Sequence, residues 1–152
     1  MTVAAIRPDS WNFPLLLHVA GAMLIVGVLV TVAGLLFAAR KGDAPALTRA
    51  SFRVMLFAGI PSYLLMRVGA EIVASEENVS DDSTWIGIGY ITSDLGGLFI
   101  IIATVLAGVG SRRLSAEGGG ERSRSGAVAA GLTVVTLAAY LVAIWAMATK
   151  PA

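Results

Sequence analysis

The sequence contains no cysteine and only one histidine among its 152 residues. The lack of cysteine excludes disulfide bonds, cysteine-ligated zinc, iron–sulfur clusters and thiol catalysis within this chain. Charge is also scarce, because only 14% of the residues are charged, whereas a soluble domain carries about 25%. No segment interleaves aromatic side chains with lysine and arginine, so nucleic acid is not an expected partner. Polar residues are therefore too few to cover the core of a soluble domain.

Apolar residues make up 57% of the chain and are concentrated in four blocks. The blocks cover about residues 13–39, 51–74, 85–110 and 126–148. Each is long enough to cross the ~30 Å hydrocarbon core of a bilayer as an α-helix with a rise of ~1.5 Å per residue. The first block is too long for a secretory signal and is followed by Arg40 and Lys41, so we expect it to be retained. The sequence predicts an all-α membrane protein, an antiparallel four-helix transmembrane bundle in a single domain over residues 1–152, surrounded by the lipid bilayer.

The distribution of positive charge predicts the orientation of this bundle. Loops 40–50 and 111–125 carry arginine or lysine, whereas the connection between the second and third blocks carries only acidic charges. By the positive-inside rule these two loops are cytoplasmic, and both termini lie outside the plasma membrane. Trp11, Trp85 and Trp145 support this topology, because each falls at the outer end of its helix. The second of these loops contains three successive glycines, which are typical of a flexible linker.

Glycines and prolines predict features of individual helices. Gly27 and Gly34 lie seven residues apart in the first block, and Gly97 belongs to a small-residue surface of the third. Such surfaces let helices approach closely, in this chain or in a homo-oligomer or larger membrane complex. Pro45 lies two residues after Asp43, which indicates that the second helix begins within the preceding loop. Pro61 is expected to bend that helix, because proline removes one backbone hydrogen bond.

Ionisable side chains inside the blocks form one layer near the outer boundary. His18, Arg67, Glu71 and Asp94 all lie within ~12 Å of that boundary, and Tyr140 falls at the same depth. A charge at the bilayer centre costs about 2.5–3.5 kcal/mol, so these groups need partners or water. Helical spacing places the polar residues of each helix on one stripe. The candidate residues for binding a ligand or an ion are Arg67, Glu71, Asp94, Tyr140, Tyr63 and Tyr90.

Two interpretations of this layer remain open. Arg67, Glu71 and Asp94 form either a satisfied salt-bridge network that sets helix register or a site for a ligand, proton or ion. The leading hypothesis is a small polytopic membrane protein, a component of transport or of a membrane complex. Arg67 would attract an anion or hold a carboxylate pair, while the carboxylates would exchange protons or cations. A purely structural accessory subunit is an alternative, and no motif in the chain predicts a catalytic residue.

His18 supports a different hypothesis, a metal or redox protein. Together with Met23, Met66 and Met147 it offers the soft ligands that suit Cu(I), although methionines in apolar helices are more often packing residues. A haem would need methionine ligation or a dimer, because the chain has a single imidazole. We expect no cofactor, with haem or copper at His18 and Met66 as the alternative. The other alternative for His18 is a hydrogen-bonded structural histidine.

The first block also contains a short motif with a known likeness. Leu17-His18-Val19-Ala20-Gly21-Ala22-Met23, continuing into Val26-Gly27-Val28, resembles the first helix of CopD-type copper-resistance domains and of the small bacterial four-helix membrane proteins similar to them. In that pattern a histidine near the outer helix end is followed by a tryptophan and one or two glycines. Here Gly27 keeps a glycine position, while Ile25 replaces the tryptophan and Val28 the second glycine. The resemblance implies a role in copper handling or an unknown role, with His18 as the only residue carried over.

Overall fold

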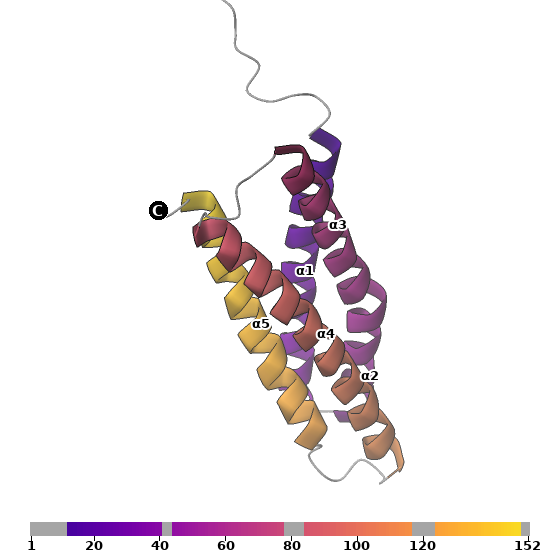
Figure 1. Ribbon diagram of the computed structural model, residues 1–152. Helices are drawn as coiled ribbons and strands as arrows, with labels where there is room; N and C mark the ends of the chain where they lie inside the picture. Colours follow the sequence, from indigo (N-terminus) through magenta and orange to yellow (C-terminus); the bar gives the residue numbers. More distant parts are fainter. Residues whose placement is uncertain (1–11, 41–43, 78–83, 117–123, 150–152) are drawn as a thin grey trace, which may run out of the picture.

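The chain folds into a bundle of four long helices. The computed structural model describes residues 12–40, 44–77, 84–116 and 124–149. Four helices in these ranges are long and apolar enough to cross a membrane, and successive helices run up and down side by side (Figure 1). The predicted all-α four-helix transmembrane bundle is confirmed. Trp11 lies outside the described residues.

The described elements are α1 (Asn12–Ala38), α2 (Ala44–Val54), the π-helical turn η2 (Met55–Gly59), α3 (Ile60–Glu77), α4 (Thr84–Ala116) and α5 (Arg124–Thr149). The second span comprises α2, η2 and α3, and it begins at Ala44 within the preceding loop, as the proline at position 45 indicates. One prediction is wrong, because residues 111–116 of the expected flexible loop 111–125 are helical. On this continuation of α4, Ser111 and Ser115 donate hydrogen bonds to the carbonyls of Gly108 and Ser111, both at 2.9 Å.

The second span is interrupted next to Pro61, where the sequence predicts a bend. The N–H of Ile60 donates to the carbonyl of Met55, five residues earlier, which defines the π-helical turn. Proline has no N–H to offer the carbonyl four residues before it, and a wider turn is one way in which a helix accommodates that loss. After the interruption the partners change, since α2 packs mainly on α4 whereas α3 packs mainly on α1. As a result α3 and α4 diverge toward the upper end of Figure 1.

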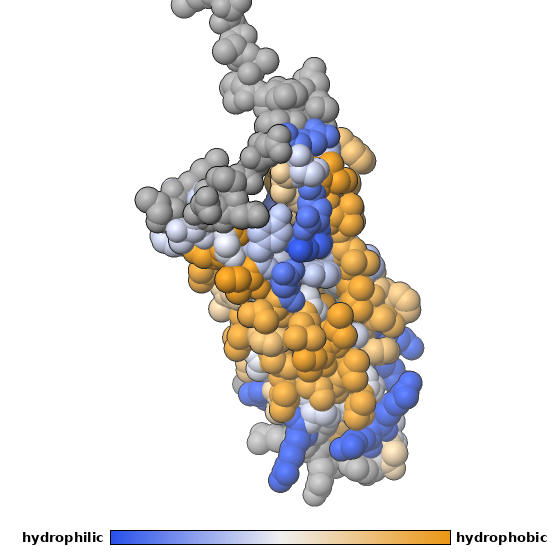
Figure 2. Space-filling view, in the orientation of Figure 1, coloured by the Kyte–Doolittle hydropathy of each residue, from blue (hydrophilic) through white to orange (hydrophobic). Residues whose placement is uncertain are grey.

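The core is a narrow apolar seam along the bundle axis. Ile25 and Leu29 of α1 are completely buried, and Ile100 of α4 and Ala129 of α5 pack against the same cluster. Outward-facing residues are also apolar, as Figure 2 shows around the middle of the molecule, with hydrophilic residues toward both ends. A helix that is apolar on all sides suits a lipid environment, because hydrocarbon can cover the outer face. This surface supports contact with a bilayer.

Helices α1 and α3 approach each other closely where they cross. A side-chain carbon added to Gly69 would lie 2.7 Å from the carbonyl oxygen of Pro14, and one added to Gly21 would overlap the backbone of Met66. By contrast, Gly27 and Gly34 have nothing within 4 Å of an added carbon. These two glycines therefore face outward and do not bring helices of this chain together. A close contact at small residues of α1 is therefore present, but it is made at Gly21 and not at Gly27 or Gly34.

Candidate functional site

Arg67 is the centre of the polar layer and joins two helices. Its Nη1 atom lies 2.8 Å from Oε1 of Glu71, one turn later on α3. Its Nη2 atom lies 3.1 Å from Oδ1 of Asp94, which comes from α4. The structure thus brings together the three charged residues that their shared depth and helical spacing predict to meet. We call Arg67, Glu71 and Asp94 the Arg67 cluster.

Tyr90 extends this cluster on the α4 side. It precedes Asp94 by one turn, and the Arg67 guanidinium carbon lies 5.1 Å from the centre of its ring. A guanidinium above an aromatic face is attracted by the ring's negative face. Both terminal nitrogens of Arg67 therefore pair with carboxylates, and its guanidinium group lies near an aromatic ring. An anion that approached Arg67 would have to displace these groups.

The carboxylates of the cluster remain open to the surroundings. The side chains of Glu71 and Asp94 are 51% and 61% exposed, whereas that of Arg67 is 26% exposed. Figure 2 shows a hydrophilic stripe on this side of the bundle, which runs from the upper end into the apolar belt. One positive and two negative groups leave the cluster with a net charge of about −1 when all three are ionised. The cluster thus presents uncompensated negative charge along a path that starts at the end of the bundle.

Two tyrosines pack beneath the cluster against a pair of glycines. The ring of Tyr63 from α3 lies on Gly97, and the ring of Tyr140 from α5 lies on Gly96, where added side-chain carbons would clash with both rings. Tyr140 is buried. These contacts assign Gly97 a local role, namely to admit an aromatic ring. Helical periodicity predicts Tyr63 and Tyr140 as inward-facing polar positions, but it does not reveal the glycines that accept them.

Two buried hydroxyl groups lie in this region without a hydrogen-bond partner among the described residues: those of Tyr140 and Ser93. Ser93 precedes Asp94 on α4, and its residue exposure is 8%. Buried hydroxyls without a partner are rare, and each one indicates strain, bound water or a functional role. Nothing in the residue pattern points to Ser93, because one serine in an apolar helix carries no distinctive signal.

His18 lies at the crossing of α1 and α3, apart from the ion pairs. Its Nδ1 atom is 3.0 Å from the carbonyl oxygen of Met66. Since a carbonyl only accepts, Nδ1 carries the hydrogen and donates it. The structure therefore shows His18 as a hydrogen-bonded residue that ties two helices together. This arrangement leaves Nε2 as the ring nitrogen that can accept a proton or bind a ligand.

The sulfur atoms proposed for a soft metal site point to different surroundings. Met66 is buried, Met23 is 72% exposed on α1, and the methyl group of Met147 packs beside Gly89 of α4. Within the described ranges no group of three or more His, Asp and Glu side chains is arranged to hold a metal ion. Haem or copper at His18 stays a prediction that these observations leave untested.

The hydrogen bond of His18 makes a prediction about stability. Replacing His18 with alanine is expected to lower the free energy of unfolding by about 0.5–1.5 kcal/mol, because the Met66 carbonyl loses its side-chain donor. Asparagine has a donor at a similar distance from the backbone, so His18→Asn should recover part of the loss. Unfolding in mixed micelles, followed by tryptophan fluorescence, measures both variants. Wild-type stability in the alanine variant would show that the hydrogen bond contributes nothing.

Comparison with known proteins returned no relative. No protein-family model, curated protein or solved structure matches the chain. The resemblance of the His18 motif to CopD-type domains accordingly stays a prediction. The chemistry of the chain's own residues, above all of the Arg67 cluster, is therefore the basis for assigning a function.

Proposed function

We propose that this small polytopic membrane protein is a component of transport or of a membrane complex, and that it binds a cation at Glu71 and Asp94. One observation carries this proposal: Arg67 engages one oxygen of each carboxylate, while both carboxylates stay more than half exposed. Each carboxylate therefore has a second oxygen available, and the cluster has an excess negative charge. Arg67 positions the two carboxylates and is itself neutralised by them. The net negative charge that remains favours a cation over an anion as the ligand.

The surrounding residues suit a small cation that enters from the end of the bundle. The hydrophilic stripe in Figure 2 continues to that end, where Glu76 is exposed on the last turns of α3. Oxygen atoms are the ligands that hard cations prefer, and the two exposed carboxylates supply them. A protein of four helices has little room for a pore of its own, so transport would require an oligomer.

The same proposal assigns a side of the membrane to the cluster. Arg49, Arg53, Arg112, Arg113 and Arg124 lie at the ends of helices opposite the Arg67 cluster. The positive-inside rule then places this basic end in the cytoplasm, both termini outside, and the cluster facing outward across the plasma membrane. Trp85 and Trp145, near the other end, are consistent with an outer interface there.

A cation-dependent change in stability tests the proposal. We expect one of three probes (Na⁺, Mg²⁺ or tetramethylammonium) to raise the thermal unfolding midpoint of the purified protein above its value in N-methylglucamine at equal ionic strength. A ligand that binds only the folded state stabilises it by about 2.7 kcal/mol at a hundred times its Kd. The shift should disappear in Asp94→Asn and in Glu71→Gln, because each variant removes one charged ligand.

Glu76→Gln is the matched control, since it removes an exposed carboxylate from the same helix end without touching the cluster. It should keep the full shift. If no probe shifts the midpoint, or if Glu76→Gln abolishes the shift as completely as Asp94→Asn, the cluster is not a cation site.

A second candidate is the docking of a partner's transmembrane segment that carries a lysine or arginine. The observation that favours it is the apolar surface beside the cluster, where Val68, Ile91 and Leu95 are 52%, 64% and 50% exposed. A segment with one basic side chain would pair with the excess negative charge and cover these residues. Affinity purification in mild detergent should then recover a defined partner with the wild type and Glu76→Gln, but not with Asp94→Asn. Equal recovery with all three proteins would contradict this candidate.

A further inference from the structure

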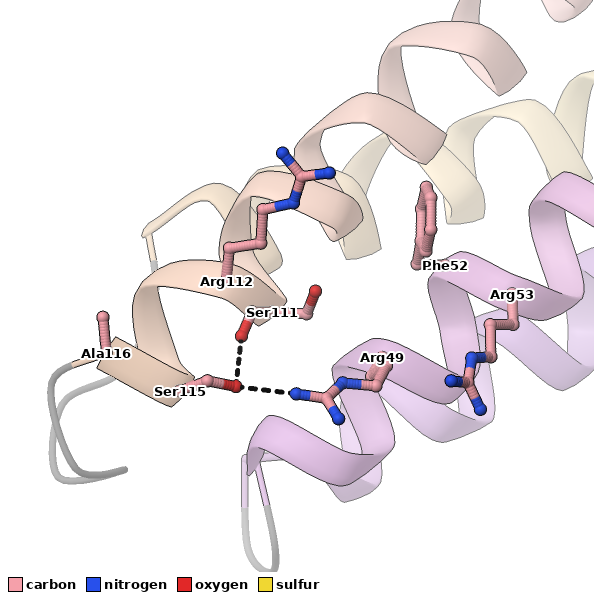
Figure 3. Close-up of a pocket in the computed structure, with 7 residues that line it drawn as sticks. All are labelled: Arg49, Phe52, Arg53, Ser111, Arg112, Ser115 and Ala116. Carbon is pink, nitrogen blue, oxygen red and sulfur yellow. Dashed lines mark hydrogen bonds between the residues drawn. The ribbon is translucent and has the colours of Figure 1, made fainter.

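A second polar site lies at the opposite end of the bundle, between α2 and α4. Three arginines, two serines and one aromatic ring line a pocket of about 520 Å³ there: Arg49, Phe52, Arg53, Ser111, Arg112 and Ser115. Figure 3 shows that α2 supplies the first three residues and the last turns of α4 supply the others. This pocket exists because α4 remains helical beyond residue 110 and α2 begins at residue 44. Both helices therefore continue past their apolar blocks and face each other with polar residues.

The pocket has a strong excess of positive charge. No aspartate or glutamate occurs in α2 or in residues 95–116 of α4. Within the described part of the chain, the ion pairs are the two that Arg67 makes at the other end. Arg49, Arg53 and Arg112 are all exposed, and none of them has a carboxylate partner among the described residues. The three arginines that line this pocket give it a positive potential, which favours an anion.

One of these arginines is already held in position. The Nη2 atom of Arg49 donates a hydrogen bond of 3.0 Å to the hydroxyl oxygen of Ser115. That hydroxyl donates in turn to the carbonyl of Ser111 at 2.9 Å, as the dashed lines in Figure 3 show. A guanidinium has five N–H donors, so Arg49 keeps four for a ligand. Holding the side chain across the pocket before binding reduces the entropy that a ligand must overcome.

The arrangement of polar and apolar groups indicates the class of ligand. Guanidinium groups bind phosphate oxygens in pairs, with matching geometry. In Figure 3 the ring of Phe52 lies farther from the loop end than Arg49 and Ser115 do, and it packs over Gly108. The pocket therefore has Arg49 and Ser115 toward the end of the spans and the Phe52 ring toward the apolar belt, with Arg53 next to Phe52 on α2. A phospholipid has the same order, a phosphate followed by acyl chains.

We propose that this pocket binds the phosphate of an anionic phospholipid headgroup. Basic pockets between transmembrane helices are known sites for such headgroups, because the charge of the lipid is attracted and its chains stay in the bilayer. Free phosphate shares the charged chemistry but has no chain to place along Phe52. The site does not depend on the Arg67 cluster, so the two proposals fail independently.

Lipid titration of the purified full-length protein tests the assignment. Native mass spectrometry, or the thermal unfolding midpoint in detergent, is recorded against dioctanoyl phosphatidylglycerol, dioctanoyl phosphatidylcholine and inorganic phosphate. We expect phosphatidylglycerol to bind more tightly than the other two, and the double variant Arg49→Gln/Arg112→Gln to bind it at least about tenfold more weakly, since two charge-assisted contacts are lost.

The matched control removes the same charge nearby. Arg113→Gln/Arg124→Gln takes two exposed arginines from the same end of the bundle, and neither lines the pocket. It should change the affinity for phosphatidylglycerol by no more than about threefold, because only the general field is reduced. Arg53→Gln/Arg112→Gln keeps the bond between Arg49 and Ser115, so it distinguishes loss of binding from loosening of the helices.

Four outcomes would overturn the proposal. Equal weakening in the control pair would reveal non-specific attraction to the basic end. Equal binding of phosphatidylcholine would reveal an apolar contact alone. Tight binding of inorganic phosphate, with no gain from the lipid chains, would identify free phosphate as the ligand. Unchanged lipid affinity in both pocket variants would show that lipid binds elsewhere.

Discussion

Replacing Gly69 with alanine is expected to lower the free energy of unfolding by about 3 kcal/mol, the upper part of the range for overpacking a close contact. The added methyl group would lie against the backbone of His18 and the carbonyl oxygen of Pro14, at the closest approach of α3 to α1. Backbone atoms in a helix cannot rotate away as a flexible side chain does, so the two helices must separate. Gly21→Ala should have a similar effect, because its methyl group would overlap the backbone of Met66.

Gly27→Ala and Gly34→Ala are the matched controls on α1. An added carbon at either position meets nothing within 4 Å, so both variants should stay within about 0.5 kcal/mol of the wild type. Unfolding in mixed micelles of dodecyl maltoside and dodecyl sulfate, followed by tryptophan fluorescence, measures all four variants. If Gly69→Ala is as stable as Gly27→Ala, α1 and α3 do not approach each other closely at Gly69.

Replacing Arg67 with alanine is expected to destabilise the protein by about 1–2 kcal/mol, less than the 3–5 kcal/mol that follows when a fully buried ion pair is broken. The variant leaves Glu71 and Asp94 near each other without a cation, and it removes a tie between α3 and α4 where these helices diverge. Their exposure of 51% and 61% explains the smaller figure, since solvent screens both charges. The same unfolding assay measures this loss.

Arg67→Lys separates charge from geometry at this position. Lysine keeps the positive charge but cannot reach two carboxylates with a planar fork, so we expect about half of the stability to return. The triple variant Arg67→Ala/Glu71→Gln/Asp94→Asn removes the whole charged network. It should recover most of the stability that Arg67→Ala loses. If the triple variant is no more stable than Arg67→Ala, repulsion between unpaired carboxylates is not the cause of the loss.

The number of helices and the depth of the charged layer follow from the order of residues along the chain. Hydrophobic runs of this length have few alternatives in a bilayer, because every backbone polar group must be paired within the segment. Counting residues along these helices also places Arg67 beside Glu71, and both at the level of Asp94. Position along a helix is a one-dimensional property. It could therefore be predicted without knowledge of any neighbour.

The rotation and tilt of each helix were decided only by the tertiary structure. Gly27 was as plausible a contact as Gly21 from its size, but the face that α1 turns toward α3 selects Gly21 and leaves Gly27 outside. Gly96 becomes part of the candidate site because the ring of Tyr140 reaches α4 there from α5. Such contacts depend on how whole helices pack, which is set by many small van der Waals terms and by no single residue.

A four-helix membrane bundle, with a charged layer toward one end and arginines at the other, can be derived from the residues alone. The contact of Arg67 with both carboxylates on an exposed face, and the pocket that α2 and α4 line with their arginines, depend on how the helices pack. One cause explains both differences. The hydrophobicity of a segment is a sum over its own residues, so it can be calculated from the sequence. A site between helices depends on which faces come into contact, and this is a property of the packed bundle.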